Sequence, residues 1–120
     1  MKFSRFEDII AWQKAQNFAV DIYAHFENLK DWNFKHQICV AVISISNNIA
    51  EGFDRSSDAE FRRFLFYALG SCSEVKSMLY LAPRLKYLKE EILVLLRDQS
   101  SEISKIINGL IKSFGNSSDD

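Results

Sequence analysis

The sequence predicts an all-α protein folded as an antiparallel up-down-up-down four-helix bundle. Apolar residues recur at steps of three and four along four long segments, which places them on one face of each helix. The 120 residues include one proline and four glycines, too few for a protein built from strands and turns. Short polar linkers separate the segments, so successive helices should run in opposite directions. We therefore predict a single domain over residues 1–115, followed by a short polar tail at 116–120.

The first helix is expected from about Phe6 to Leu29. Ser4 and Glu7 have the spacing of a capping box at its start. The linker 30–33 interrupts the apolar period, and Asn33 is expected to cap the helix that follows. The predicted core face of this first helix is Ala11, Ala15, Phe18, Ile22, Phe26 and Leu29.

The second helix is expected from about Phe34 to Glu51, with Gly52 just past its end in the position that helix-terminating glycines favour. Its last turns are unusual. Asn47 and Asn48 are poor helix formers, and a carboxylate at Glu51 opposes the helix dipole. Local propensity does not explain these residues, so a polar network or a site must account for them. The predicted core face is Phe34, Ile38, Val42, Ile45 and Ile49.

The third helix is expected to start at a capping box, Ser57 to Glu60, and to run to about Ala82, next to Pro83. The fourth is expected from Lys89 until Gly115. The third helix has a heptad-like core face of Phe61, Leu65, Ala68, Cys72, Val75, Leu79 and Ala82. The fourth should bury Ile92, Leu96, Ile103, Ile106, Leu110 and Phe114.

Two of these helices carry more apolar surface than a monomeric bundle can bury. Residues 38–43 and 64–69 are apolar on all sides of their helices. Four helices cannot enclose two of their members, so this surface should meet another subunit, and we expect a homo-oligomer. Gly70, in the middle of the third helix, is expected where another helix approaches closely.

Charge and composition exclude several classes of protein. The formal net charge is −1, so no overall basic field steers the chain to nucleic acid. Cys39 and Cys72 are far apart in apolar runs, as buried reduced thiols are. No signal peptide and no run long enough to cross a bilayer is visible, so we expect a cytoplasmic protein without membrane contact.

Polar residues follow one face of each of the two central helices. Seven of them are expected to form a structural polar network between helices or subunits, and the alternative is a binding or catalytic cleft. The network residues are Gln37, Ser44, Asn48, Glu51, Arg63, Ser71 and Glu74.

No motif for catalysis or metal binding accompanies these carboxylates. A di-iron bundle needs Glu-x-x-His pairs, yet His25 and His36 are preceded at that spacing by Ile22 and Asn33. Zinc spacings, a phosphate-binding loop and a nucleophile elbow are missing too. We therefore expect no enzyme and no cofactor. The weakest of the functional hypotheses is an enzyme that uses Glu51 and Glu74 as acid and base.

The chain resembles the four-helix-bundle family encoded within intervening sequences of bacterial 23S rRNA genes. The resemblance rests on segments spread over nearly the whole chain, of which Asn48–Gly52 and Leu69–Glu74 are the most specific. The matching segments are 6–8, 11–15, 37–38, 44–45, 48–52, 60–61, 64–65, 68–71 with Glu74, and Leu85-x-Tyr87-Leu88.

The resemblance implies a left-handed antiparallel bundle that assembles as a homopentamer and has no enzymatic activity. Similar subunits assist the reverse transcriptases of diversity-generating retroelements and bind RNA, so RNA and a reverse transcriptase are the implied partners besides a second copy of the chain. Where the family carries two arginines this sequence has Cys39 and Val40, which weakens the expectation of RNA binding. The remaining candidate phosphate contacts are Arg55, Arg62, Arg63, Lys76, Arg84, Lys86 and Lys89.

Overall fold

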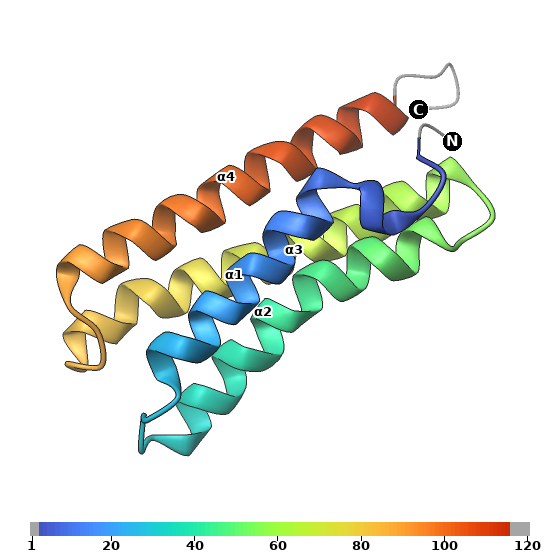
Figure 1. Ribbon diagram of the computed structural model, residues 1–120. Coiled ribbons are helices and arrows are strands. Elements are labelled where there is room, and N and C mark those ends of the chain that lie inside the picture. Colours follow the sequence, from blue (N-terminus) through green and yellow to red (C-terminus); the bar gives the residue numbers. More distant parts are fainter. Residues whose placement is uncertain (1–2, 116–120) are drawn as a thin grey trace.

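The computed structural model describes residues 3–115, and these form a rod of packed helices (Figure 1). Its principal extents are 49 × 20 × 19 Å. Each helix packs against its neighbours in the sequence, and the first also packs against the last, which closes the bundle. The described residues contain no strand. The predicted all-α bundle is confirmed, whereas the predicted tail at 116–120 lies outside the described residues. The elements are η1 (Phe6–Asp8, a 3₁₀ turn), α1 (Ile10–Phe26), α2 (Trp32–Phe53), α3 (Asp58–Arg84) and α4 (Glu90–Phe114).

The apolar periods of the first three helices coincide with the observed core. The predicted faces of α1, α2 and α3 are buried throughout, except that Leu29 lies just beyond α1 and is only partly buried. Three neighbouring pairs, 92–93, 106–107 and 110–111, are apolar in α4, so its sequence permits two overlapping stripes. The structure buries the second residue of each pair, and the first residues remain at the edge of the core. The buried positions of α4 are Leu93, Leu96, Ser100, Ile103, Ile107 and Ile111.

The start of α1 differs from its prediction. The capping box of Ser4 and Glu7 does not form, because Ser4 Oγ donates instead to Asp8 Oδ2 at 3.3 Å. Ile9 follows in an extended conformation and is fully buried, so the regular helix begins only after it. Burying this one side chain breaks what the sequence suggests is a single longer helix.

Of the two caps predicted for α2 and α3, the first is wrong and the second is confirmed. Asp31, not Asn33, caps α2 by accepting a hydrogen bond from the Phe34 N–H at 3.1 Å. Ser57 caps α3 as predicted, since its side chain accepts from the Glu60 N–H at 3.1 Å.

The prediction that Gly52 lies just past the end of α2 is wrong, because the glycine lies within the last turn of the helix. A Cβ at this position would overlap Phe64 Cβ and come within 3.3 Å of Phe61 Cδ1, so the glycine allows α2 and α3 to approach closely. The expectation for Gly70 is also wrong within this chain. Within residues 3–115, a Cβ built there meets no neighbouring side chain or other helix within 4 Å.

The loops 27–31 and 85–89 meet at one end of the bundle. Tyr87 Oη donates to Asp31 Oδ2 at 2.6 Å, and the Tyr87 ring packs edge-on against Phe34. Lys86 adopts a positive φ of 65°, and the hydrogen bonds around it, including Tyr87 N to Ala82 O at 2.8 Å, form a Schellman motif. The two loops are thus held together by Tyr87, the last residue of this motif.

This contact predicts a specific dependence of stability on pH. The hydroxyl of Tyr87 and the N–H of Phe34 lower the pKa of Asp31. A carboxyl group with a lowered folded pKa contributes stability above its unfolded pKa and loses it as the pH falls through the folded value. The difference in melting temperature between the natural protein and Tyr87→Phe should therefore shrink as the pH falls below about 4. A difference that stays constant down to about pH 2 would contradict this assignment.

Candidate functional site

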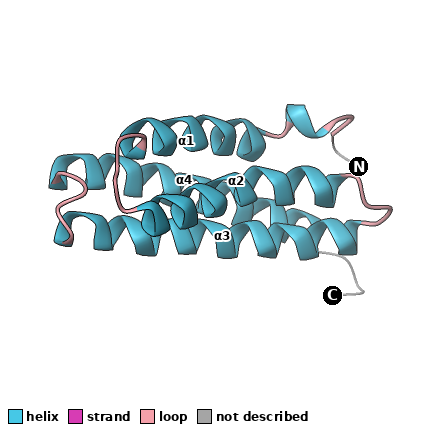
Figure 2. Ribbon diagram, turned by 90° about the horizontal axis from the view of Figure 1, so that it is seen from below, coloured by secondary structure: helices cyan, strands magenta, loops and turns pink. Residues whose placement is uncertain are grey.

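The two polar stripes lie on one outer surface, because α2 and α3 run side by side (Figure 2). In each helix the stripe adjoins the residues that pack against the other helix, such as Gly52 and Phe64. We name this surface the α2/α3 face. It comprises Gln37, Val40, Ser44, Asn48 and Glu51 of α2 and Arg63, Tyr67, Gly70, Ser71, Glu74 and Leu81 of α3.

Phe64 is buried beside this face, at the contact between α2 and α3, and two arginines and a tyrosine pack around its ring. The guanidinium carbons of Arg55 and Arg63 lie 4.7 Å and 5.1 Å from the centroid of its ring, and Tyr67 packs edge-on at 5.3 Å. Arg63 also binds Glu60 through two nitrogens, at 2.9 Å and 3.0 Å, and thereby lowers the pKa of that carboxyl group. Both arginines are therefore engaged by aromatic rings and by carboxylates.

The predicted polar network does not link helices within one chain. Ser44 Oγ donates to Val40 O, and Asn48 Nδ2 donates to Ser44 O, each at 2.8 Å. Glu51 pairs with Arg55 at 3.2 Å. Among residues 3–115, no side-chain hydrogen bond crosses to another helix from any of the seven network residues. Ser44, Asn48, Glu51 and Arg63 find their partners within four residues of the chain, so a network between subunits stays a prediction.

Two side-chain hydrogen bonds that cross between helices were missed by sequence reasoning. Gln16 Nε2 donates to Ser46 Oγ at 3.0 Å and links α1 to α2. Gln99 Nε2 donates to Asp21 Oδ2 at 2.8 Å and links α4 to α1. These residues stand singly at the edges of their helices, and no repeated spacing in the sequence marks them.

Apolar side chains are exposed on the α2/α3 face. Val40 is 49% exposed, Tyr67 is 47% exposed and Leu81 is 43% exposed. The space around Gly70 is open, and Ser44 and Ser71 are small. This combination of exposed apolar and small side chains can pack against another polypeptide.

The structure separates the candidate phosphate contacts into three groups. Arg55 and Arg63 surround Phe64. Arg62 lies on the other side of α3, where its Nε donates to Ile111 O of α4 at 3.3 Å, and Lys76 follows two heptads later on the same side. A third group stands around the turn between α3 and α4: Arg84, Lys86 and Lys89.

The two positions that differ from the family's arginine pair also differ in environment. Cys39 is buried on the α1 side of α2, where burial raises the pKa of its thiol and Tyr23 is a hydrogen-bonding neighbour. Val40 points outward on the α2/α3 face. An arginine would therefore reach solvent directly only at position 40.

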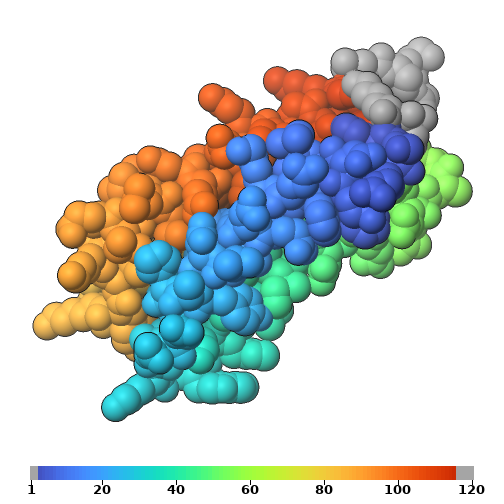
Figure 3. All heavy atoms as spheres, in the orientation of Figure 1, coloured from blue at the N-terminus to red at the C-terminus, as the bar shows by residue number. Residues whose placement is uncertain are grey.

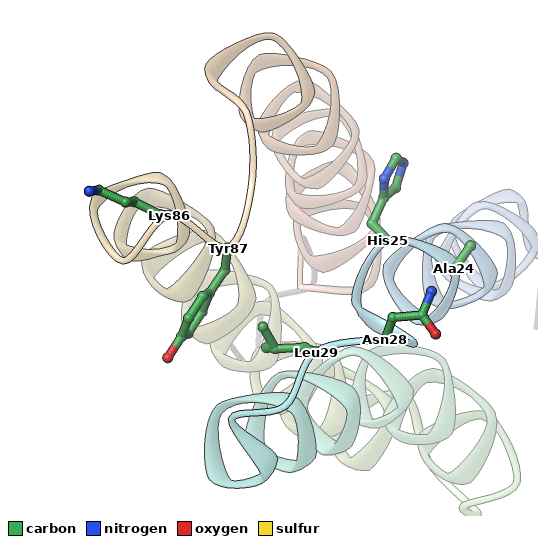
Figure 4. A pocket seen from close by; sticks show the side chains of 6 residues that line it. All are labelled: Ala24, His25, Asn28, Leu29, Lys86 and Tyr87. Carbon is green, nitrogen blue, oxygen red and sulfur yellow. The ribbon is translucent and has the colours of Figure 1, made fainter.

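A shallow hollow occupies the end of the bundle where the two loops meet (Figure 4). Its volume is about 260 Å³. The side chains of His25 and Lys86 point in different directions, so the polar groups do not converge on one point. The hollow is lined by Ala24, His25, Asn28, Leu29, Lys86 and Tyr87.

The face of the molecule shown in Figure 3 is formed at its centre by α1, which extends from η1 to the turn before α2.

Two further findings concern metal binding and membrane crossing. Within residues 3–115, no three His, Cys, Asp or Glu side chains are grouped so that they could hold a metal ion. None of the helices in this described region has the length and apolarity needed to cross a membrane.

Comparison with known proteins identifies one family. The sequence model of the 23S rRNA-intervening sequence protein family matches residues 7–109. The fold is similar to the crystal structure of a protein of unknown function from the S23 ribosomal protein family of Bacteroides thetaiotaomicron VPI-5482. That chain is 30% identical to this one, with a TM-score of 0.80, and the match covers 86% of this chain and 99% of the other. No curated protein matches significantly.

Proposed function

Because the chain belongs to the 23S rRNA-intervening sequence protein family, we propose that it is a non-catalytic, homo-oligomeric scaffold of the cytoplasm that engages a protein or nucleic-acid partner. The observation that carries this proposal is the α2/α3 face, which presents exposed apolar side chains and an uncovered glycine on one side of the bundle. Burying this face against a second copy removes Val40, Tyr67 and Leu81 from water. Gly70 and the small serines allow that copy to approach closely.

A pentamer, which the family resemblance implies, sets a condition on the second surface. A closed ring of five is built from head-to-tail contacts, so each subunit must present two different patches. The α2/α3 face supplies one patch. The second is proposed on α1 and the adjoining side of α2, where Val20, Tyr23 and Ile43 are exposed.

The weaker alternative, an enzyme with Glu51 and Glu74 as acid and base, has less support. Glu51 is exposed and paired with Arg55, which is exposed as well. Neither a buried environment nor an enclosed cavity adjoins these carboxylates, and such surroundings are what usually tune a catalytic acid or base.

Two glycines provide a matched test of self-association. Gly70 and Gly109 are both exposed within helices, and a Cβ at either one meets no atom within 4 Å. Gly70 lies on the α2/α3 face, whereas Gly109 lies on the outer side of α4. Light scattering should give about 70 kDa for the natural protein, five times the 13.9 kDa of one chain. Gly70→Arg should reduce this mass to that of a monomer with unchanged helical circular dichroism, and Gly109→Arg should not.

A monodisperse monomer of the natural protein contradicts the proposal, as does an equal effect of the two glycine variants. Mixing tests the two-patch arrangement. Val20→Arg should also give monomers, because it damages the other patch. A mixture of Gly70→Arg and Val20→Arg retains one intact pair of patches and should yield dimers of one copy of each. If the mixture remains monomeric, the two residues do not belong to opposite patches of a ring.

A further inference from the structure

We propose that the outer surface along α3 and α4 binds single-stranded nucleic acid through a strip of cations and exposed aromatic rings. This inference names the class of partner for the proposed scaffold, but it concerns a different face from the one assigned to self-association. We name the surface the cation–aromatic strip. It comprises Arg62, Phe66, Lys76 and Tyr80 of α3 and Arg97, Lys105 and Lys112 of α4.

Two hydrogen bonds establish which parts of α3 and α4 lie opposite each other. Arg62 Nε donates to Ile111 O, and Ser100 Oγ donates to Cys72 O, each at 3.3 Å. In this antiparallel register Lys112 lies beside Arg62, and Arg97 lies beside Lys76. Lys105 is two turns of α4 before Lys112 on the same side of the helix and lies between the two pairs. Cations are therefore present along the whole length of the strip.

The strip carries a local charge opposite to that of the rest of the protein. Its five cations are accompanied by three carboxylates. Asp98 pairs with Arg97 at 3.4 Å, whereas Asp58 and Glu90 lie at the two ends of the strip, one turn before Arg62 and two turns before Arg97. The resulting charge is +2 on a chain whose total is −1, so −3 remains elsewhere. Glu102, the next carboxylate of α4, faces α1 and pairs with Lys14 at 3.2 Å, so it does not neutralise the strip. The near-neutral total therefore conceals a polarised surface that favours a polyanion.

The exposed aromatic rings favour a single strand over other polyanions. Phe66 is 51% exposed and Tyr80 is 48% exposed, and each follows a cation of α3 by one helical turn. The guanidinium carbon of Arg62 lies 5.7 Å from the centroid of the Phe66 ring. Bases of a single strand can stack on such rings while the phosphates contact the neighbouring cations. A duplex keeps its bases inside, and an acidic protein has no bases to stack, so neither would use the rings in this way.

The strip also differs from the site where the family carries its arginine pair. Cys39 and Val40 are on α2, whereas every member of the strip is on α3 or α4. Only Arg62 and Lys76 of the strip are among the phosphate contacts predicted from the sequence. Lys105 and Lys112 were missed, although their spacing of seven residues is a signal that they share a helix side.

Binding can be tested with a fluorescent oligouridine of about 12 nucleotides, followed by anisotropy between about 50 and 200 mM salt. The double variant Lys105→Glu with Lys112→Glu should weaken binding at least about tenfold at low salt and reduce the salt dependence. The matched control is Arg5→Glu with Lys30→Glu, which changes the net charge equally at exposed positions outside the strip. The control should weaken binding by less than about threefold.

A second pair of variants isolates the rings. Phe66→Ala with Tyr80→Ala should weaken binding to the oligouridine at least about tenfold and leave the salt dependence unchanged, because it removes stacking and no charge. Absence of binding by the natural protein at low salt would overturn the proposal, as would equal losses in the strip variant and its control. Equal binding of a duplex, or equally effective competition by polyglutamate, would assign the strip to another class of polyanion. Light scattering should also be used to measure the mass of each variant. A variant that binds the oligouridine weakly but keeps the mass of the natural protein has lost the strip and not self-association.

Discussion

Gly52→Ala is expected to lower the free energy of unfolding by about 2 kcal/mol, although alanine is the better helix former. The added Cβ would overlap Phe64 Cβ and lie 3.2 Å from Phe64 Cγ. The root of a side chain cannot move aside by changing rotamer, so α2 and α3 must separate. Overpacking of this kind costs about 1–3 kcal/mol or more, which exceeds the gain of about 1 kcal/mol in helix propensity. Denaturant unfolding followed by circular dichroism measures the difference.

Gly109→Ala is the matched control for this prediction. Gly109 also lies within a helix, but a Cβ there meets no atom within 4 Å. The substitution should therefore show only the higher helix propensity of alanine, which raises the free energy of unfolding by up to about 1 kcal/mol. Opposite signs for the two substitutions are expected, and stabilisation by both would contradict the close approach of α2 and α3 at Gly52.

Phe61→Ala is expected to lower the free energy of unfolding by about 3–5 kcal/mol, the largest effect predicted for this protein. The ring is fully buried where the ends of three helices meet. It packs edge-on against Phe53 of α2, at 5.9 Å between centroids, and against Phe114 of α4, at 4.9 Å. Truncation would leave a cavity among side chains that are held by three different helices and cannot collapse together.

Phe66→Ala gives the comparison on the same helix. Phe66 lies little more than one turn after Phe61 but is half exposed, and its ring contacts the guanidinium group of Arg62. Its truncation should lower the free energy of unfolding by less than about 1 kcal/mol. Similar losses of unfolding free energy in the two variants would contradict the assignment of Phe61 to the core.

The sequence alone determined the helices and most of the core. A helical period is a local property, so the buried faces of α1, α2 and α3 could be predicted without knowing what they pack against. The Ser57 cap could be predicted for the same reason, because donor and acceptor are three residues apart. The excess of apolar surface on α2 and α3 was visible as well, and Val40 and Tyr67 are indeed exposed.

The tertiary structure decided everything that depends on which helix faces which. Gly52 looked like a helix end, but the proximity of Phe64 gives it another role, and that contact joins residues of two different helices. In α4 two apolar stripes were compatible with the sequence, and only packing against the other helices selected one of them. The cations of α3 and α4 are more than 20 residues apart in sequence, and an antiparallel register brings them into one strip. Periodicity reports the faces of single helices, whereas charge strips and close contacts arise between helices, where the chain order carries no direct signal.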